Sequence, residues 1–159
     1  ARDRSVGFAL KVHQRWWALA EGYTSIRWTF DPLVRRNAVL NLRKLGVDVI
    51  GYHENFYGEM PDEVNAGDFS DRMMAEWRLD SDQVEQALTA PLDAVVVTGV
   101  HVVVEVPDDI VALRRRDPEQ ALQWRLRVRE EIRPRLDAGW RVVGLSPSAG
   151  YVLVPAEAS

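Results

Sequence analysis

The spacing of apolar residues near the start of the chain predicts an amphipathic helix over about residues 7–21. Polar residues fall between the apolar ones at the spacing that places them on the opposite side of such a helix. The apolar face holds Ala9, Val12, Trp16, Leu19 and Ala20, and the polar face holds Lys11, Gln14 and Arg15. We therefore expect Trp16 and its neighbour Trp17 to pack in the core or against a sheet.

Apolar runs and turn residues divide the rest of the first half into further elements. We expect strands at 25–30, 47–51 and 72–79, and a helix that includes 37–45 and ends at Gly46. Between the last two strands, the segment 59–71 combines acidic residues with Pro, Asn and Gly, which is typical of a loop.

The second half has its own alternation of elements. Ser81 is a good cap for a short helix, and Asp117 followed by Pro and Glu is a good start for a long helix that ends near residue 137. The remaining expected elements are β-branched runs at 95–97 and 100–106, a helical turn at 107–113, and two strands at 141–145 and 151–154 joined by a hairpin loop. The sequence thus predicts an α/β fold with a mixed β-sheet and packing helices.

Composition narrows the class of protein. The 159 residues are 47% hydrophobic and include no cysteine, which excludes disulfides and thiolate chemistry. No apolar run approaches the ~20 residues of a membrane span, so we expect a cytoplasmic protein with no membrane partner. The net charge is −4, yet residues 1–50 carry nine Lys or Arg against four acids. The excess of basic residues in the first third suits binding of a phosphate-rich cofactor, whereas the net negative charge of the whole chain does not suit binding of nucleic acid.

Residues 4–9 carry the sharpest motif, R-x-x-G-x-A, with Arg4, Gly7 and Ala9 at its defined positions. At the start of a helix, unpaired backbone N–H groups and the helix dipole favour a phosphate. The motif resembles the acyl-CoA signature of the GCN5-related N-acetyltransferases, the GNAT superfamily. The resemblance continues through W-T-F-D-P-L at 28–33 and A-V-L-N-L-R-K-L-G-V at 38–47, and it covers about residues 1–58. Within this span the chain is most similar to a bacterial subgroup of predicted GNAT proteins.

The resemblance implies an N-acyltransferase that moves an acyl group, acetyl or succinyl-like, from CoA to a primary amine by direct attack. Its implied partners are acyl-CoA and a small-molecule amine, and a homodimer is left open. The implied cofactor-binding residues are Arg4, Ser5, Val6, Gly7, Phe8, Ala9 and Leu10, mainly through backbone N–H groups, with Asn37 and Asn41 near the pantetheine.

Two departures from the family pattern affect these expectations. Leu42 stands where many members carry the Tyr that protonates the departing CoA thiolate. In the family, the acyl-CoA motif follows four strands, whereas this chain reaches it at its fourth residue. We therefore expect 1–80 to be the C-terminal part of an N-terminally incomplete GNAT domain, with an open edge on the strand 25–30. Residues 81–159 form an αβ extension that could pack on the same sheet.

Titratable side chains follow the predicted strand 47–51, where the family has the acceptor end of its cleft. His53 and Glu54 are candidate bases, and Tyr52 or Tyr57 is the candidate acid in place of Leu42. The alternative for each is packing or plain exposure to solvent. No metal is expected, because the acidic loop lacks the spacing of a calcium site.

Two other functions stay open. One is a degenerate GNAT-like domain that binds a CoA ester or a protein partner without catalysis, which the loss of the Tyr at Leu42 favours. The other is an unrelated α/β interaction module in which the first motif binds nothing.

Overall fold

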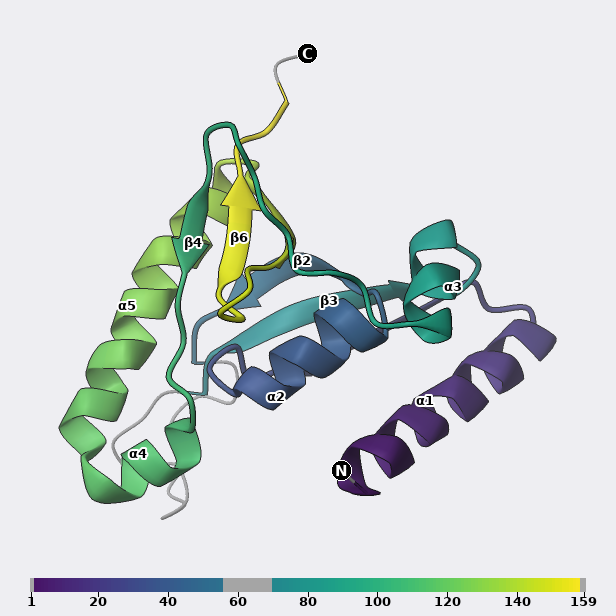
Figure 1. Cartoon of the computed structure of the whole chain (residues 1–159), viewed down its shortest axis with the longest axis horizontal. Coiled ribbons are helices and arrows are strands. Elements are labelled where there is room, and N and C mark those ends of the chain that lie inside the picture. The colour runs from purple at the N-terminus through teal and green to yellow at the C-terminus, as the bar shows by residue number, and fades with distance from the viewer. Residues whose placement is uncertain (1, 56–69, 158–159) are drawn as a thin grey trace.

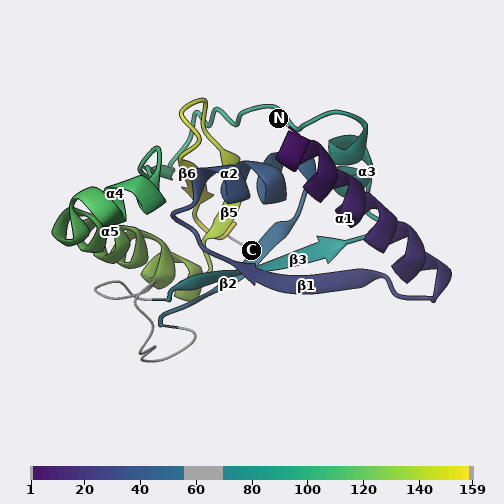
Figure 2. The same cartoon turned by 90° about the horizontal axis from the view of Figure 1, so that it is seen from below.

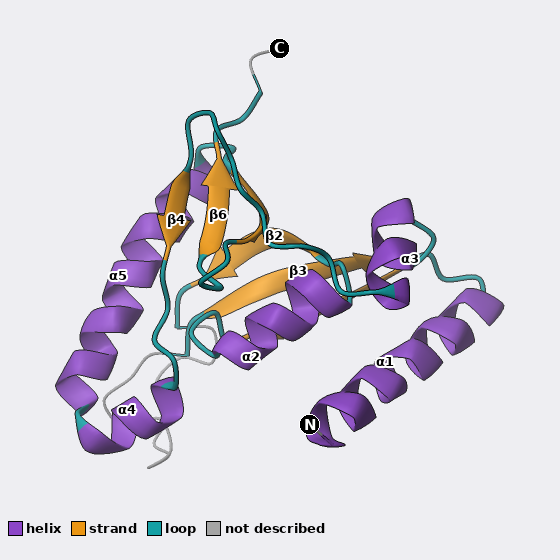
Figure 3. Cartoon of the chain, viewed as in Figure 1, coloured by secondary structure: helices purple, strands orange, loops and turns teal. Residues whose placement is uncertain are grey.

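The computed structural model describes residues 2–55 and 70–157, and it has a mixed α/β architecture (Figures 1 and 3). Helices and strands alternate along the chain, as the sequence predicts. The elements are α1 (Arg2–Ala20), β1 (Ser25–Phe30), α2 (Arg35–Ala38), the π-helix η1 (Val39–Lys44), β2 (Asp48–His53), β3 (Arg72–Arg78), α3 (Asp82–Thr89), β4 (Val102–Val104), α4 (Ile110–Arg116), α5 (Pro118–Asp137), β5 (Arg141–Leu145) and β6 (Tyr151–Val154).

The strands form two small antiparallel sheets in the described part of the chain, in place of the single mixed sheet expected. The first has the order β1-β3-β2 and the second the order β4-β6-β5. The predicted α/β class is therefore confirmed, and the predicted arrangement of strands is wrong. In the second sheet β5 and β6 are joined by a short loop and pair with each other, and β4 pairs with the other side of β6.

Strand β1 is at the edge of the first sheet, with β3 as its one partner among the described strands, which confirms the expected open edge. The amide of Leu79 donates to the carbonyl of Thr24 at 2.9 Å, and the same register pairs Ile26 with Trp77. In an antiparallel pair, alternate residues direct their N–H and C=O groups toward the partner. The backbone groups of Ser25, Arg27 and Thr29 therefore point outward from the sheet.

Helices α1 and α2 lie over one face of this sheet (Figure 2). The side chains of β3 that point toward the helices are buried: Met73, Ala75 and Trp77. The other face carries exposed ion pairs, Arg27 with Glu76 and Arg78 with Asp48. The first sheet is therefore covered on one side and solvated on the other, as its alternating sequence requires.

Helix α1 is rotated about its axis from the predicted orientation. Of the predicted apolar face, Leu19 packs against the core and Val12 is half-buried, whereas Ala9, Trp16 and Ala20 are exposed. Trp16 and Trp17 expose 69% and 53% of their surface, so the prediction that they pack in the core is wrong. Lys11, which was expected in solvent, instead places its ammonium group 3.7 Å from the centroid of the Trp28 ring. Long basic side chains can pack their aliphatic stems against apolar surface in this way, which the apolar pattern alone does not reveal.

The helix after β1 widens from α2 into the π-helical η1, and the amide of Leu45 donates to the carbonyl of Leu40, five residues earlier, at 2.9 Å. Gly46 ends the helix with a positive φ of 72°, as predicted. A Cβ there would lie 3.0 Å from both the Cβ of Ala87 and the carbonyl oxygen of Gln83. The close approach of α3 therefore requires glycine at this position.

Two of the predicted caps in the second half are confirmed. Ser81 accepts a hydrogen bond from the amide of Val84, and Asp117 accepts one from the amide of Gln120. The predicted strand 95–97 is not a strand, although the amide of Val95 donates to Leu145 at 2.8 Å. One such bond aligns the segment beside β5 without forming a ladder.

Residues on both sides of position 80 contribute to one cluster of buried apolar side chains. Helix α5 contacts β2 of the first sheet and β4 of the second, and β5 contacts β2 and η1. The 81–159 segment thus packs directly on the elements that precede it. None of the described helices is long and apolar enough to cross a bilayer.

Candidate functional site

The R-x-x-G-x-A motif lies inside α1 rather than in a turn before it, because the helix already begins at Arg2. Arg4 and Ser5 belong to its first turn. Val6 to Leu10 lie beyond that turn, where amides donate to carbonyls four residues earlier. The prediction that the amides of Val6, Gly7, Phe8, Ala9 and Leu10 cradle a phosphate is therefore wrong. Phe8 instead packs against the core.

In the helix after β1, the side-chain Nδ2 of Asn41 donates a 2.8 Å hydrogen bond to the backbone carbonyl of Asn37. Asn41 is buried, and its oxygen accepts a hydrogen bond from the indole of Trp28 at 3.0 Å. Its side chain is thus already used in fixing η1 to β1. Leu42 beside it is buried in the core, in agreement with its apolar character.

The start of α2 is rich in positive charge. Its first turn holds no acidic residue and no side chain caps it, while Arg35 and Arg36 occupy its first two positions. Arg35 pairs with Asp108 at 2.6 Å and donates to the carbonyl of Val106 at 2.9 Å. A hollow of about 380 Å³ separates this end of α2 from α4. It is lined by Val34, Arg35, Arg36, Asp108, Asp109, Ile110, Val111, Ala112 and Arg115.

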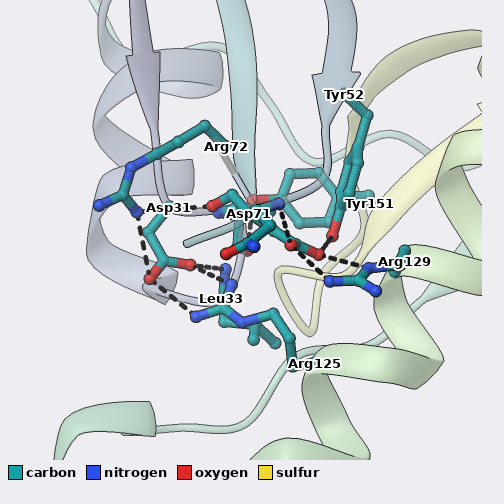
Figure 4. Close-up of polar contacts among 10 residues, drawn as sticks. Asp31, Leu33, Tyr52, Asp71, Arg72, Arg125, Arg129 and Tyr151 are labelled. Atoms are coloured by element: carbon teal, nitrogen blue, oxygen red, sulfur yellow. Dashed lines mark hydrogen bonds and ion pairs between the residues drawn. The ribbon is translucent and has the colours of Figure 1, made fainter. Parts of the chain in front are cut away.

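Tyr52, the candidate acid on β2, is buried, and its hydroxyl donates a 2.8 Å hydrogen bond to Oδ2 of Asp71 (Figure 4). Burial raises the pKa of Tyr52 far above its ordinary value, and the neighbouring Asp71 carboxylate raises it further. The hydroxyl therefore keeps its proton, which is already engaged in the hydrogen bond to Asp71.

Asp71 accepts hydrogen bonds from three residues. Besides Tyr52, Arg129 donates from Nε to Oδ2 at 2.9 Å and from Nη2 to Oδ1 at 2.7 Å, and the Asn55 amide donates to Oδ1 at 2.9 Å. Burial by itself raises the pKa of Asp71, but the hydrogen bonds from Arg129, Asn55 and Tyr52 outweigh it and lower this pKa. The hydrogen bonds to Asp71 raise the pKa of Arg129. The pair therefore stays fully ionised.

A second buried ion pair lies beside the first, between Asp31 after β1 and Arg125 on α5 (Figure 4). Arg125 is only 1% exposed and binds both Asp31 oxygens, at 2.7 and 3.0 Å. Arg72 approaches the same carboxylate at 3.5 Å. The Tyr151 hydroxyl donates to the carbonyl of Pro32 at 2.7 Å. The two ion pairs join the end of the first sheet to α5, and the Tyr151 hydrogen bond joins it to the second sheet.

The arginines of α5 stand next to Glu130 and Glu131, which is the pattern of a charged surface, so the charge pattern alone does not indicate this network. The structure instead buries Arg125 and pairs Arg129 with Asp71. Their spacing carries the signal that could have found them. Arg125 falls in register with the apolar positions of α5, and Arg129 is one turn further. The buried apolar positions of α5 are Ala121, Val128 and Ile132.

Of the remaining catalytic candidates, Glu54 forms ion pairs with Arg129 at 3.1 Å and with Arg133, both on α5. His53 is exposed, and Tyr57 lies outside the described residues. In both views α2 lies between α1 and α5 (Figures 1 and 2). Tyr52 and Glu54 therefore join the α5 side of the molecule, and the structure does not bring them to the α1 motif.

This arrangement offers two kinds of chemistry. The Asp71 and Asp31 clusters are saturated with internal partners and serve to fix the fold, whereas the start of α2 borders a hollow lined by three arginines and two aspartates. The described residues contain no group of three or more His, Cys, Asp or Glu that could hold a metal. Comparison of the chain with protein-family models, with curated proteins and with solved structures finds no match.

Proposed function

We propose that the chain binds an acyl-CoA and takes part in transfer of its acyl group, acetyl or succinyl-like, to a primary amine by direct attack. The order of the motifs supports this. R-x-x-G-x-A lies on α1, the strand β1 follows, and A-V-L-N-L-R-K-L-G-V runs from α2 through η1. The observation that carries the proposal is that α1 and α2 lie over the same face of the first sheet and run in roughly the same direction, so that their N-terminal ends point to the same side of the molecule (Figures 1 and 2).

Helix N-termini that point to the same side favour a ligand long enough to reach both with several negative charges, because free amides and helix dipoles attract anions. The composition of α2 strengthens the argument. Two arginines at the positive end of a helix are unfavourable by themselves, and an exposed carboxylate, Asp108, is the partner of Arg35. A bound phosphate would compensate both Arg35 and Arg36, and the 380 Å³ hollow beside them gives it room.

The phosphate contacts are accordingly proposed for the first turn of α1, which includes Arg4 and Ser5, and for the start of α2. Gly7 has a role consistent with this. A Cβ added to Gly7 meets no atom within 4 Å, so the fold itself does not require glycine there. The missing side chain would instead allow a bound ligand to approach the helix closely.

Proton transfer needs a group that can reach solvent and substrate, because the acceptor ammonium must lose a proton before it attacks. Tyr52 and Glu54 are committed to Asp71, Arg129 and Arg133. Water is therefore the proposed carrier of both protons, the one that the acceptor ammonium loses and the one that the departing thiolate receives.

A second candidate is binding of a CoA ester without turnover. The observation that favours it is the hydrogen bond that commits the Tyr52 hydroxyl to Asp71, together with Leu42 at the place of the usual acid. In this alternative the start of α2 still binds the phosphates.

Calorimetry with CoA, acetyl-CoA and succinyl-CoA tests the binding that both candidates share. Replacing Arg36 with alanine should weaken CoA binding about tenfold, because a charge-assisted hydrogen bond contributes at least ~1.5 kcal/mol. Arg27→Ala, on the opposite face of the sheet, is the matched control and should leave binding unchanged. Gly7→Glu should abolish binding and still fold, since the added side chain begins in open space.

An assay of thiol release with a panel of primary amines then separates the candidates. Binding with turnover supports the acyltransferase, and binding without turnover supports the second candidate. Absence of binding to every CoA ester refutes both.

A further inference from the structure

The side of α1 that faces away from the sheet is largely apolar from Val6 to Ala20. We call it the outer face of α1. It consists of Val6, Ala9, Leu10, His13, Trp16, Trp17 and Ala20, all of which are exposed. The ring of His13 stacks on Trp16 at 6.3 Å, and Trp17 stacks on the exposed Tyr23 at 6.4 Å, which extends the apolar surface past the end of the helix.

The spacing of the outer face is that of a helix side that packs against another helix. Its members fall at the a, d and e positions of a heptad, the pattern of a core-facing helix. The sheet-facing side packs Phe8, Ala18 and Leu19 on the core and also uses Lys11 and Arg15, with Arg15 donating to the carbonyl of Leu79 at 2.9 Å. A surface helix normally presents its charges to water and its apolar side to the core. In α1 the side away from the core is apolar as well, which indicates that something covers the outer face.

We propose that the cover is a second copy of this chain, packed through α1 in an antiparallel pair about a two-fold axis at His13. The positions of the outer-face residues are symmetric in sequence number about His13. Val6 then meets Ala20 of the partner subunit, Ala9 meets Trp17 of the partner subunit, and Leu10 meets Trp16 of the partner subunit. The two-fold therefore pairs members of the face only with one another.

The sizes of these pairs are complementary as well. The small Ala9 leaves space for one indole, and Ala20 leaves space for Val6. Small residues opposite large ones are what interdigitating helices require. A two-fold interface must be self-complementary in this sense, because the same surface is used by both copies. A different partner would not require this symmetry.

The area is sufficient for a specific dimer. Aromatic side chains carry roughly 150–250 Å² each, so Trp16, Trp17 and Tyr23 at their observed exposures leave roughly 350 Å² uncovered per copy. Val6, Leu10 and the two alanines add to this. Two facing copies then pass the roughly 1,000 Å² of total buried surface that a specific interface needs. The inference does not depend on binding of CoA.

Light scattering after gel filtration tests the proposal directly. The wild-type chain should have twice the monomer mass of 18.1 kDa, and the double variant Trp16→Glu/Trp17→Glu should have the monomer mass. The matched control is Val96→Glu/Val100→Glu, which adds the same charges at exposed apolar residues far along the chain and should stay dimeric. Circular dichroism checks that each variant keeps its helix content.

Cross-linking gives a second, independent measurement. Helices packed about 8–10 Å apart place facing Cα atoms roughly 4–6 Å from each other, within the range of a disulfide. His13→Cys should therefore form an intermolecular disulfide under mild oxidation, and the chain has no native cysteine to compete. Gln14→Cys, about 100° further around the helix, is the control and should stay reduced.

A monomeric wild-type chain that gives no His13→Cys cross-link overturns the proposal. A dimer that survives Trp16→Glu/Trp17→Glu also overturns it, because the interface then lies elsewhere. If the monomer sediments with phosphatidylcholine and phosphatidylserine vesicles through the two tryptophans, the outer face of α1 binds a lipid surface instead.

Discussion

Replacing Asp71 with asparagine should destabilise the folded chain by about 3 kcal/mol, because it removes a carboxylate oxygen that accepts hydrogen bonds where α5 meets β2. Asp71 is completely buried and receives four hydrogen bonds, two from Arg129, one from Tyr52 and one from the Asn55 amide. Asparagine keeps the shape of the side chain, so the substitution leaves no cavity. What changes is the number of acceptors and the charge opposite Arg129.

The magnitude follows from counting these bonds. The side-chain NH₂ of asparagine cannot accept, so whichever oxygen it replaces, two donors lose their acceptor. One of them always belongs to Arg129, and such a bond to a charged group contributes about 1.5–3 kcal/mol. The other is neutral, from Tyr52 or from the Asn55 amide, and contributes about 0.5–1.5 kcal/mol. Arg129 retains Glu54 as a partner at 3.1 Å, which keeps the loss at the lower part of the combined range.

Urea unfolding followed by tryptophan fluorescence measures this loss, with an unchanged slope as the sign that the two states are the same. Asp48→Asn is the control, since Asp48 pairs with Arg78 near the surface and should cost less than ~1 kcal/mol. If Asp71→Asn stays within ~0.5 kcal/mol of wild type, the cluster does not stabilise the fold in the way its hydrogen bonds indicate.

Three further outcomes are expected. Tyr52→Phe should lower the free energy of unfolding by about 1 kcal/mol and leave thiol release unchanged, and a loss of turnover would restore Tyr52 as a catalytic acid. Folding lowers the pKa of Asp71, so the contribution of its carboxylate to the free energy of unfolding is complete above the ordinary pKa of an aspartate and is lost as pH falls through the lower folded value. In an acid titration, the free energy of unfolding of Asp71→Asn should therefore fall less steeply than that of wild type. Gly46→Ala should destabilise by at least ~1 kcal/mol more than Gly22→Ala in urea unfolding, because both have positive φ but only Gly46 also lacks space for a Cβ, and equal losses would contradict this.

Local signals in the sequence predicted most elements of the fold. The caps at Ser81 and Asp117 and the stop at Gly46 act within a few residues of where they occur, so the chain pattern is enough to place them. Strand pairing is different, because it joins segments far apart. The division into two antiparallel sheets could not be predicted from the apolar runs, which do not specify a partner.

The candidate site was harder to predict for the same reason. The sequence singled out Tyr52 and Glu54 as reactive groups, but their partners Asp71, Arg129 and Arg133 lie well over ten residues away along the chain. Whether a carboxylate or hydroxyl is available for chemistry depends on those partners. The orientation of α1 was mispredicted because both of its sides are apolar enough to be buried, and only one of them can face the sheet.

The open edge of β1 has a consequence for the exchange of amide protons with solvent. Ile26, Trp28 and Phe30 direct their N–H groups toward β3, whereas Ser25, Arg27 and Thr29 direct theirs outward. Transferred to D₂O, this strand should show a period of two, with the even-numbered amides exchanging slowly and the odd-numbered ones quickly. Dimerisation through α1 leaves this alternation of exchange rates unchanged, since it does not involve β1. A polypeptide that pairs with the open edge of β1 would slow exchange at the odd-numbered amides as well, and the period of two would disappear.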